Sequence, residues 1–167
     1  MTLGEDELYA CYQRLERLLF NTLYRMLWNQ HDCQDLIHDT FLRLWERRDR
    51  IDVGRLDALV WITALNLARN RLRWQRLWRT ESFDADWPDS QPTPEAVIDG
   101  LTQPRRLHKA LERLPIAMRE VVLLSEFSEL SQADIARVLH IPAGTVASRR
   151  HHALGRLRLL LAEDDHD

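Results

Sequence analysis

The stretch SQADIARVLHIPAGTVASRR, residues 131–150, decides the fold. Ser131 followed by Asp134 resembles a capping box, in which a hydroxyl and a carboxylate satisfy the free N–H groups of a first helical turn. Pro142 cannot continue that helix, but it can begin another. The stretch therefore predicts two short helices that are joined at about residues 139–142, with the second running from Ala143 past Ala153.

The second of these helices carries short polar and basic side chains along one face. Spacings of three and four place on that face Thr145, Ser148, Arg149, His152 and Arg156. Such side chains on the leading turns of the second helix of a pair suit the major groove of DNA. An ordinary helical hairpin with a solvated basic face remains the alternative.

Charge is segregated along the chain. The 167 residues are 45% hydrophobic, which is enough for packed cores, and the net charge is -3. However, residues 58–80 and 135–161 contain no acid, and residues 81–104 contain no lysine or arginine. Two basic helices separated by an acidic connector are typical of a nucleic-acid-binding protein whose overall charge conceals its binding surface.

Apolar periodicity predicts helices almost throughout. One long helix covers about residues 8–27, a second follows a break at 29–32, and a third covers 56–78 after a loop at 50–55. The acidic, proline-containing residues 80–104 form a linker with a short helical turn near Pro94 to Leu101, and four helices follow. We predict an all-α fold with two small helical domains, 1–79 and 105–167. Contacts between the domains or with a partner should contribute to their order, because each domain is small.

No enzyme, metal or cofactor site is predicted. His31, Cys33 and His38 suggest a metal, but a fourth ligand at zinc-site spacing is missing, and we interpret Asp32 and Asp35 as residues that begin a helix. No catalytic constellation or glycine-rich phosphate loop stands out, so we expect no small-molecule substrate. Two cysteines without a secretory signal indicate the cytosol.

The third helix combines arginines with tryptophans. Arg69, Arg73 and Arg76 share a face, and near it lie Asn66, Asn70, Trp74 and Trp78. Arginine contacts phosphate, asparagine can read base edges, and aromatic rings stack on unpaired bases. The alternative is a solvated helix whose tryptophans fill the core, and we expect most of these tryptophans to be core residues in either case.

Three segments in this order resemble a bacterial extracytoplasmic-function (ECF, group 4) RNA polymerase sigma factor. They are DCQDLIHDTFLRLWERRDRI at 32–51, ALVWITALNLARNRLRWQR at 58–76 and, after the acidic linker, LHKALERLPIAMREVVLLSEFSELSQADIARVLHIPAGTVASRRHHALGRLR at 107–158. The resemblance covers most of the chain, and the pairing of both motifs around such a linker is specific. A stand-alone helix-turn-helix regulator is the alternative function.

The resemblance implies roles for individual residues. The outward face of the second helix, which could also be plain solvated surface, would dock on the β′ clamp helices of core RNA polymerase: Asp35, Asp39, Arg43 and Glu46. The loop Ile51 to Leu56 would capture a flipped base, and the third helix would hold the strand of the -10 element. The residues implied in -10 binding are Asp52, Arg55, Asn66, Arg69, Asn70 and Arg73.

The helical pair at 131–157 would read the -35 element. Its implied contacts are Thr145, Ser148, Arg149, Arg150, His152 and Arg156. The implied partners are core RNA polymerase, through its β′ clamp helices and β flap, promoter DNA, and an anti-sigma protein, which in this family is often membrane-anchored. Leu65, Asn70, His140, Ala147 and Arg150 depart from the family pattern and bear on which promoter is read.

Overall fold

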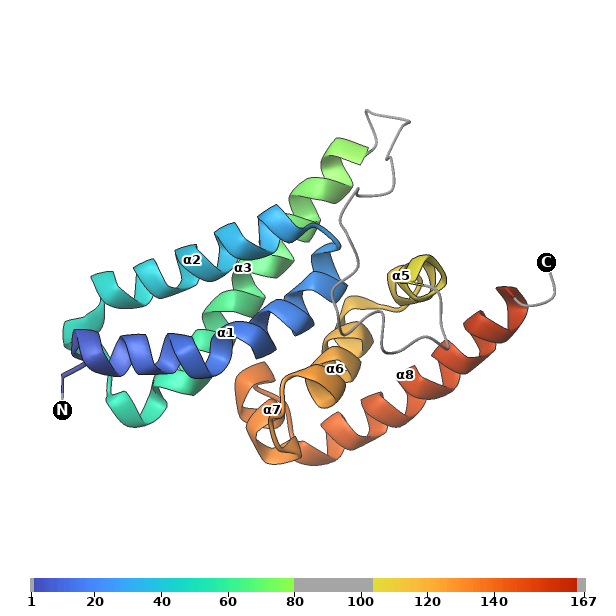
Figure 1. Cartoon of the computed structure of the whole chain (residues 1–167). Coiled ribbons are helices and arrows are strands. Elements are labelled where there is room, and N and C mark those ends of the chain that lie inside the picture. Colours follow the sequence, from blue (N-terminus) through green and yellow to red (C-terminus); the bar gives the residue numbers. More distant parts are fainter. Residues whose placement is uncertain (1, 80–103, 165–167) are drawn as a thin grey trace.

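The computed structural model describes residues 2–79 and 104–164, which form two groups of helices (Figure 1). The first group contains α1 (Glu5–Leu27), α2 (Gln30–Glu46) and α3 (Leu56–Arg79), with two 3-10 turns, Arg48–Arg50 and Val53–Arg55, between α2 and α3. The second contains α5 (Pro104–Glu112), α6 (Ile116–Phe127), α7 (Gln132–Leu139) and α8 (Ala143–Asp164). These residues contain no β-strand, only an isolated bridge between Thr2 and Asp52, so the prediction of an all-α fold is confirmed.

Apolar side chains at helical spacing bury the inner faces of the first group. Leu19 and Leu23 on α1 and Val60, Trp61 and Leu65 on α3 are at most 1% exposed. Burying one large aliphatic or aromatic side chain contributes roughly 1.5–3 kcal/mol, so these few residues carry much of the stability of the bundle. Helix α1 ends at Trp28, whose φ of 53° is left-handed and turns the chain into α2.

The start of α2 differs from the sequence-based interpretation. The N-cap is Asn29, whose side-chain oxygen accepts a hydrogen bond from the Asp32 backbone N–H at 3.0 Å. The Asp32 carboxylate instead accepts hydrogen bonds from Arg71 at 2.6 Å and Gln75 at 3.2 Å, both on α3. Asp35 is exposed and caps nothing. Asp32 therefore ties α2 to α3, which local sequence alone does not reveal.

The helical pair at 131–150 forms as predicted. The Ser131 hydroxyl accepts from the backbone N–H of Asp134 at 3.1 Å and caps α7. His140 ends α7 in the left-handed region, with φ 56° and ψ 45°, and the Ile141 N–H donates back to the Ala136 carbonyl at 3.0 Å. Pro142 then accepts the first backbone hydrogen bonds of α8.

The two groups of helices pack directly against each other. Helix α6 contacts α1, and α7 contacts α3. The Arg25 guanidinium on α1 lies 3.9 Å from the ring centroid of Phe127 on α6, and the Trp28 ring lies 4.7 Å from the His108 ring on α5. Arg25 and Trp28 are at most 4% exposed. The two domains are therefore in contact, and the expectation that such contacts contribute to their order stays a prediction.

The predicted linker, 80–104, lies outside the described residues except for Pro104, as does the helical turn expected near Pro94 to Leu101. Pro104 is the first residue of α5, a position that proline tolerates because its missing N–H would have no helical partner. Among the described residues, no helix is long and apolar enough to cross a bilayer.

The left-handed turn at His140 predicts a stability effect. A non-glycine residue in this region costs on the order of 1 kcal/mol, so His140→Gly should raise the free energy of unfolding by about that amount. His151→Gly is the matched control, because His151 is exposed within α8 and glycine there should lower stability by about 1 kcal/mol. Urea unfolding measures both changes, and a less stable His140→Gly variant would contradict the prediction.

Candidate nucleic-acid interface

The loop expected to capture a base is anchored at both ends. Ile51 and Leu56 are 7% and 3% exposed, whereas Asp52, Gly54 and Arg55 between them are exposed. The Asp52 side chain accepts a hydrogen bond from the Gly54 backbone N–H at 3.3 Å, and this closes the turn. The loop therefore presents polar groups to solvent from a fixed base.

Arg69, one of the residues implied in -10 binding, is held by the second group of helices. The Arg69 guanidinium donates through Nε and Nη2 to both carboxylate oxygens of Glu120 on α6, the latter at 2.9 Å, and its Nη1 donates to the Asn66 side chain at 2.8 Å. The hydrogen bonds to Glu120 raise the pKa of Arg69. Glu120 is 5% exposed, and the sequence analysis did not single it out.

The other residues of this face remain open to solvent. Asn70 and Arg73 are exposed on α3, one turn after Asn66 and Arg69. Trp74 and Trp78 are 60% and 64% exposed, so the expectation that these two tryptophans fill the core is wrong. The apolar packing of α3 uses Trp61 instead, which is fully buried. The last turns of α3 extend beyond the helices that cover its first half, which explains the difference (Figure 1).

A groove of about 390 Å³ between α2 and α3 brings two predicted sets together. Asp35 and Asp39, implied in polymerase docking, line it with Asn70, implied in -10 binding, and with Arg71 and Trp74. The end of α2, the two 3-10 turns and the first 14 residues of α3 separate Asp39 from Asn70 in the sequence, so their proximity is a result of tertiary packing.

The remaining residues of the expected docking face lie on the exposed side of α2. Arg43 donates to the Asp39 carboxylate at 3.2 Å, an i,i+4 ion pair, and Glu46 is exposed one turn after Leu42. Exposed ion pairs of this kind contribute little to stability, which leaves their charges available to a partner.

A second, more apolar groove lies between α1 and α2 and was missed from the sequence. It has a volume of about 720 Å³ and is lined by Tyr9, Tyr12, Phe41 and Trp45, among others. Tyr9 is 60% exposed. The sequence feature that could have predicted this groove is the apolar stripe on α1. The stripe is broader than one neighbouring helix can cover.

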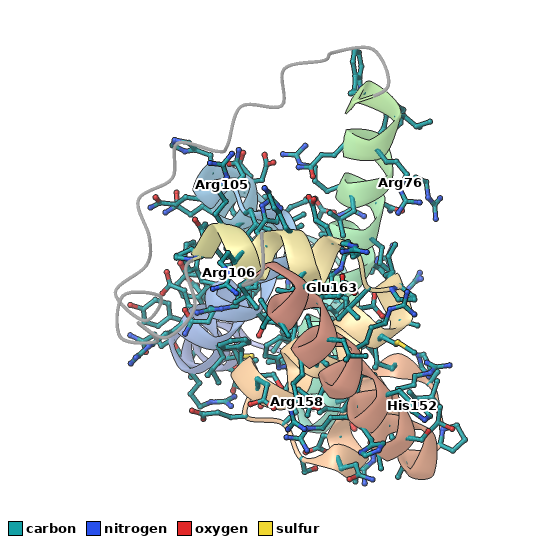
Figure 2. All side chains as sticks on the ribbon, turned by 90° about the vertical axis from the view of Figure 1, so that its right-hand side faces the viewer. Arg76, Arg105, Arg106, His152, Arg158 and Glu163 are labelled. Atoms are coloured by element: carbon teal, nitrogen blue, oxygen red, sulfur yellow. The ribbon has the colours of Figure 1, made fainter. Side chains whose placement is uncertain are left out.

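Helix α8 presents its leading turns on the outside of the molecule (Figures 1 and 2). Ser148, His152 and Arg156 are exposed, while Thr145 and Arg149 are half-buried. Arg150 pairs with Glu126 on α6 at 3.0 Å, and both side chains are more than 40% exposed. Arg150 is therefore held beside an acidic residue in this arrangement, which distinguishes it from the other residues of the set.

The cysteines are structural. Burial, and then the charge of Asp57, raise the pKa of Cys11 to about 12, and burial raises the pKa of Cys33 as well. Neither is a reactive thiolate. Within 2–79 and 104–164, no three His, Cys, Asp or Glu side chains are grouped to hold a metal ion.

Comparisons with known proteins match both groups of helices. The family model Sigma-70 region 2 matches residues 11–84, and Sigma-70, region 4 matches residues 105–157. The ECF RNA polymerase sigma factor RpoE of Cereibacter sphaeroides is 32% identical over 75% of this chain and 70% of its own length. The chain belongs to the ECF sigma factors.

Other relatives agree with this family. The ECF RNA polymerase sigma factor SigE of Mycolicibacterium smegmatis is 30% identical over 95% of this chain, which spans 62% of that relative's length. The fold resembles that of the sigma factor RpoE of Bartonella quintana, solved in complex with the anti-sigma factor NepR, with a TM-score of 0.69 and 23% identity over 95% of this chain and 96% of that one. The family consists of transcription initiation factors and not of enzymes.

Loss of the Arg69–Glu120 ion pair should allow the two groups of helices to separate. Arg69→Ala leaves the Glu120 carboxylate buried without its cation, at a cost of about 3–5 kcal/mol, and separation of the two groups of helices relieves that cost by hydrating the carboxylate. We expect a larger radius of gyration by small-angle X-ray scattering. Arg73→Ala, an exposed arginine one turn later, should leave the radius unchanged. Equal radii for both variants would show that the pair does not hold the groups together.

Proposed function

We propose that this sigma factor binds core RNA polymerase and directs promoter-specific transcription initiation in the cytoplasm, as a member of group 4. In this proposal, residues 1–79 are region 2, residues 80–104 are the linker, and residues 105–167 are region 4. The observation that carries it is the presence, in one chain, of two groups of helices, of which the first matches Sigma-70 region 2 and the second matches Sigma-70, region 4. A helix-turn-helix pair alone would support only a DNA-binding protein.

Region 4 reads the -35 element with α8 in the major groove. The exposed Ser148, His152 and Arg156, with Thr145 and Arg149 beside them, supply hydroxyl, imidazole and guanidinium groups that can contact base edges or phosphates. Arg150 donates through Nη2 to Glu126, so a contact with DNA shares its guanidinium with that carboxylate and contributes less.

Region 2 opens and captures the -10 element. The anchored loop with Asp52 and Arg55 receives a flipped base, and Asn66, Arg69, Asn70 and Arg73 line the path of the strand. Extruding a base costs a few kcal/mol, and stacking on an aromatic side chain returns about 1–3 kcal/mol. The exposed rings of Trp74 and Trp78 support this role, because they follow the basic face and are not used in the core.

Core polymerase docks on α2, where Asp35, Asp39, Arg43 and Glu46 meet the β′ clamp helices, and region 4 binds the β flap. The apolar groove between α1 and α2 adds surface that a partner helix could bury.

An anti-sigma protein, often membrane-anchored in this family, is proposed as the inhibitor. Because Glu120 holds Arg69 in the packed arrangement, a protein that binds this arrangement more tightly than the open one keeps Arg69 from DNA. The complex formed by the Bartonella sigma factor supports such a partner.

Transcription in vitro tests the proposed function. Purified full-length chain added to bacterial core polymerase should give a run-off transcript from its cognate promoter. Asp39→Arg should weaken core binding and lower the transcript, because it reverses a charge on the docking face. Gln34→Arg is the control, since Gln34 is exposed on α2 but lies outside that face.

The rival functions give other results. A stand-alone regulator would protect double-stranded operator DNA without polymerase, and a helical adaptor would bind neither. The proposal is wrong if candidate promoters yield no transcript and core binding is also absent.

The half-buried Arg149 gives a prediction for promoter reading. If it contacts a base edge, Arg149→Ala should weaken binding to the cognate -35 element by about 1–3 kcal/mol and weaken binding to unrelated DNA less. Arg158→Ala is the control, because Arg158 lies further along α8 (Figure 2). Electrophoretic mobility shifts at fixed salt measure both. Equal weakening on all sequences would identify Arg149 as a phosphate contact.

A further inference from the structure

A cleft of about 340 Å³ lies where the two regions meet. Its walls come from both sides of the interface: Met26, Leu27, Leu72 and Arg76 belong to α1 and α3, and His108 and Arg119 belong to α5 and α6. None of the residues implied in polymerase docking, -10 binding or -35 binding lines it. The cleft is large enough for a small ligand with ordered water.

Arg119 is a buried cation whose hydrogen bonding is incomplete. It is 7% exposed, its Nη2 donates to the backbone carbonyls of Glu112 at 3.0 Å and Leu114 at 3.2 Å, and its Nε has no partner. Within the described residues no hydrogen bond or ion pair uses its Nη1. The Nε atom is enclosed by protein, so Nη1 is the group of Arg119 that remains free to donate to a ligand in the cleft.

A second arginine lies close to the first. Arg76 is exposed on α3 and forms no ion pair with any residue that the structure describes. Burial, and the nearby charge of Arg76, lower the pKa of Arg119, while the charges of Glu112 and Glu120 partly offset them. The Glu112 carboxylate lies 2.8 Å from the His108 Nε2, and the Glu120 carboxylate is bonded to Arg69. The two arginines line the cleft together with Glu112, and both carboxylates near Arg119 have partners of their own.

We propose that this cleft is a binding site for a phosphate or phosphoryl group, held between Arg76 of region 2 and Arg119 of region 4. A guanidinium fork matches the oxygens of phosphate, and a tetrahedral oxyanion has enough oxygens to meet two forks from different helices. The anion relieves the repulsion between the two arginines. Because it joins α3 to α6, its binding stabilises the packed arrangement of the two regions by mass action.

The site does not rest on the proposed function, because neither DNA nor polymerase takes part in forming it. It is distinct from the Arg69–Glu120 pair, which is satisfied within the protein. In Figure 2, Arg76 lies on α3 at the right of the view, whereas Arg105 and Arg106 of α5 lie at the left, and Arg106 donates to the Leu161 carbonyl at 2.8 Å, so these two arginines are not part of the site.

Isothermal titration calorimetry of the full-length protein tests the site, with inorganic phosphate and adenosine diphosphate as separate probes at matched ionic strength. We expect phosphate to bind with a dissociation constant in the millimolar range. Arg76→Gln should weaken binding about tenfold or more, since each charge-assisted hydrogen bond is worth roughly that factor. Arg158→Gln, at an exposed arginine of α8 outside the cleft, is the control and should change binding less than twofold.

The outcomes are distinct. Tighter binding of adenosine diphosphate that is also lost in Arg76→Gln indicates a nucleotide phosphoryl group as the ligand, and equal binding indicates free phosphate. Because Arg76 is exposed, Arg76→Gln should fold, and circular dichroism checks this. The proposal is overturned if neither probe binds, or if folded Arg76→Gln binds phosphate as tightly as Arg158→Gln and the unmodified protein do. A transcript in the run-off assay alongside either result shows that the function stands without the site.

Discussion

The ion pair between Arg69 on α3 and Glu120 on α6 is the interaction on which the arrangement of this sigma factor depends. Glu120 is almost completely buried, so its carboxylate is stable there only while a cation compensates for its lost hydration. The cation comes from the helix that is proposed to hold the -10 strand. A guanidinium that donates to Glu120 through Nε and Nη2 has fewer N–H groups left for a phosphate. In the proposed function, packing of the two regions and capture of promoter DNA therefore draw on the same side chain.

Other contacts between the two regions also place a side chain of one region against a ring of the other. Arg25 lies over Phe127 and Trp28 lies against His108, so aromatic and cationic groups of α1 are covered by the region 4 helices. Two small regions bury little surface on their own, and this contact adds to it. A partner that binds the packed and the open arrangement with different affinities shifts the equilibrium between them. The difference in its binding free energy sets the size of that shift. The cationic cleft between Arg76 and Arg119 provides a further means of shifting it in the packed direction.

Local sequence predicted the helices well, because apolar spacing and capping residues act within a few turns. Ser131, His140 and Pro142 set the limits of α7 and α8 through backbone hydrogen bonds to near neighbours. Predictions failed where a side chain meets a distant helix. Asp32 bonds to Arg71 and Gln75 instead of starting a helix, and Trp74 is exposed because the second half of α3 extends past its neighbours. No local pattern contains that information.

The sequence by itself determined the all-α class, the helix-turn-helix pair, the basic face of α3 and the resemblance to ECF sigma factors, because periodicity, capping and charge segregation are properties of neighbouring residues. Tertiary structure alone decided which of those side chains are available. It placed Glu120 on Arg69, Glu126 beside Arg150, and Asp35 and Asp39 in one groove with Asn70. Pairing between distant charges depends on how the helices pack, and packing depends on the shapes of both buried faces together.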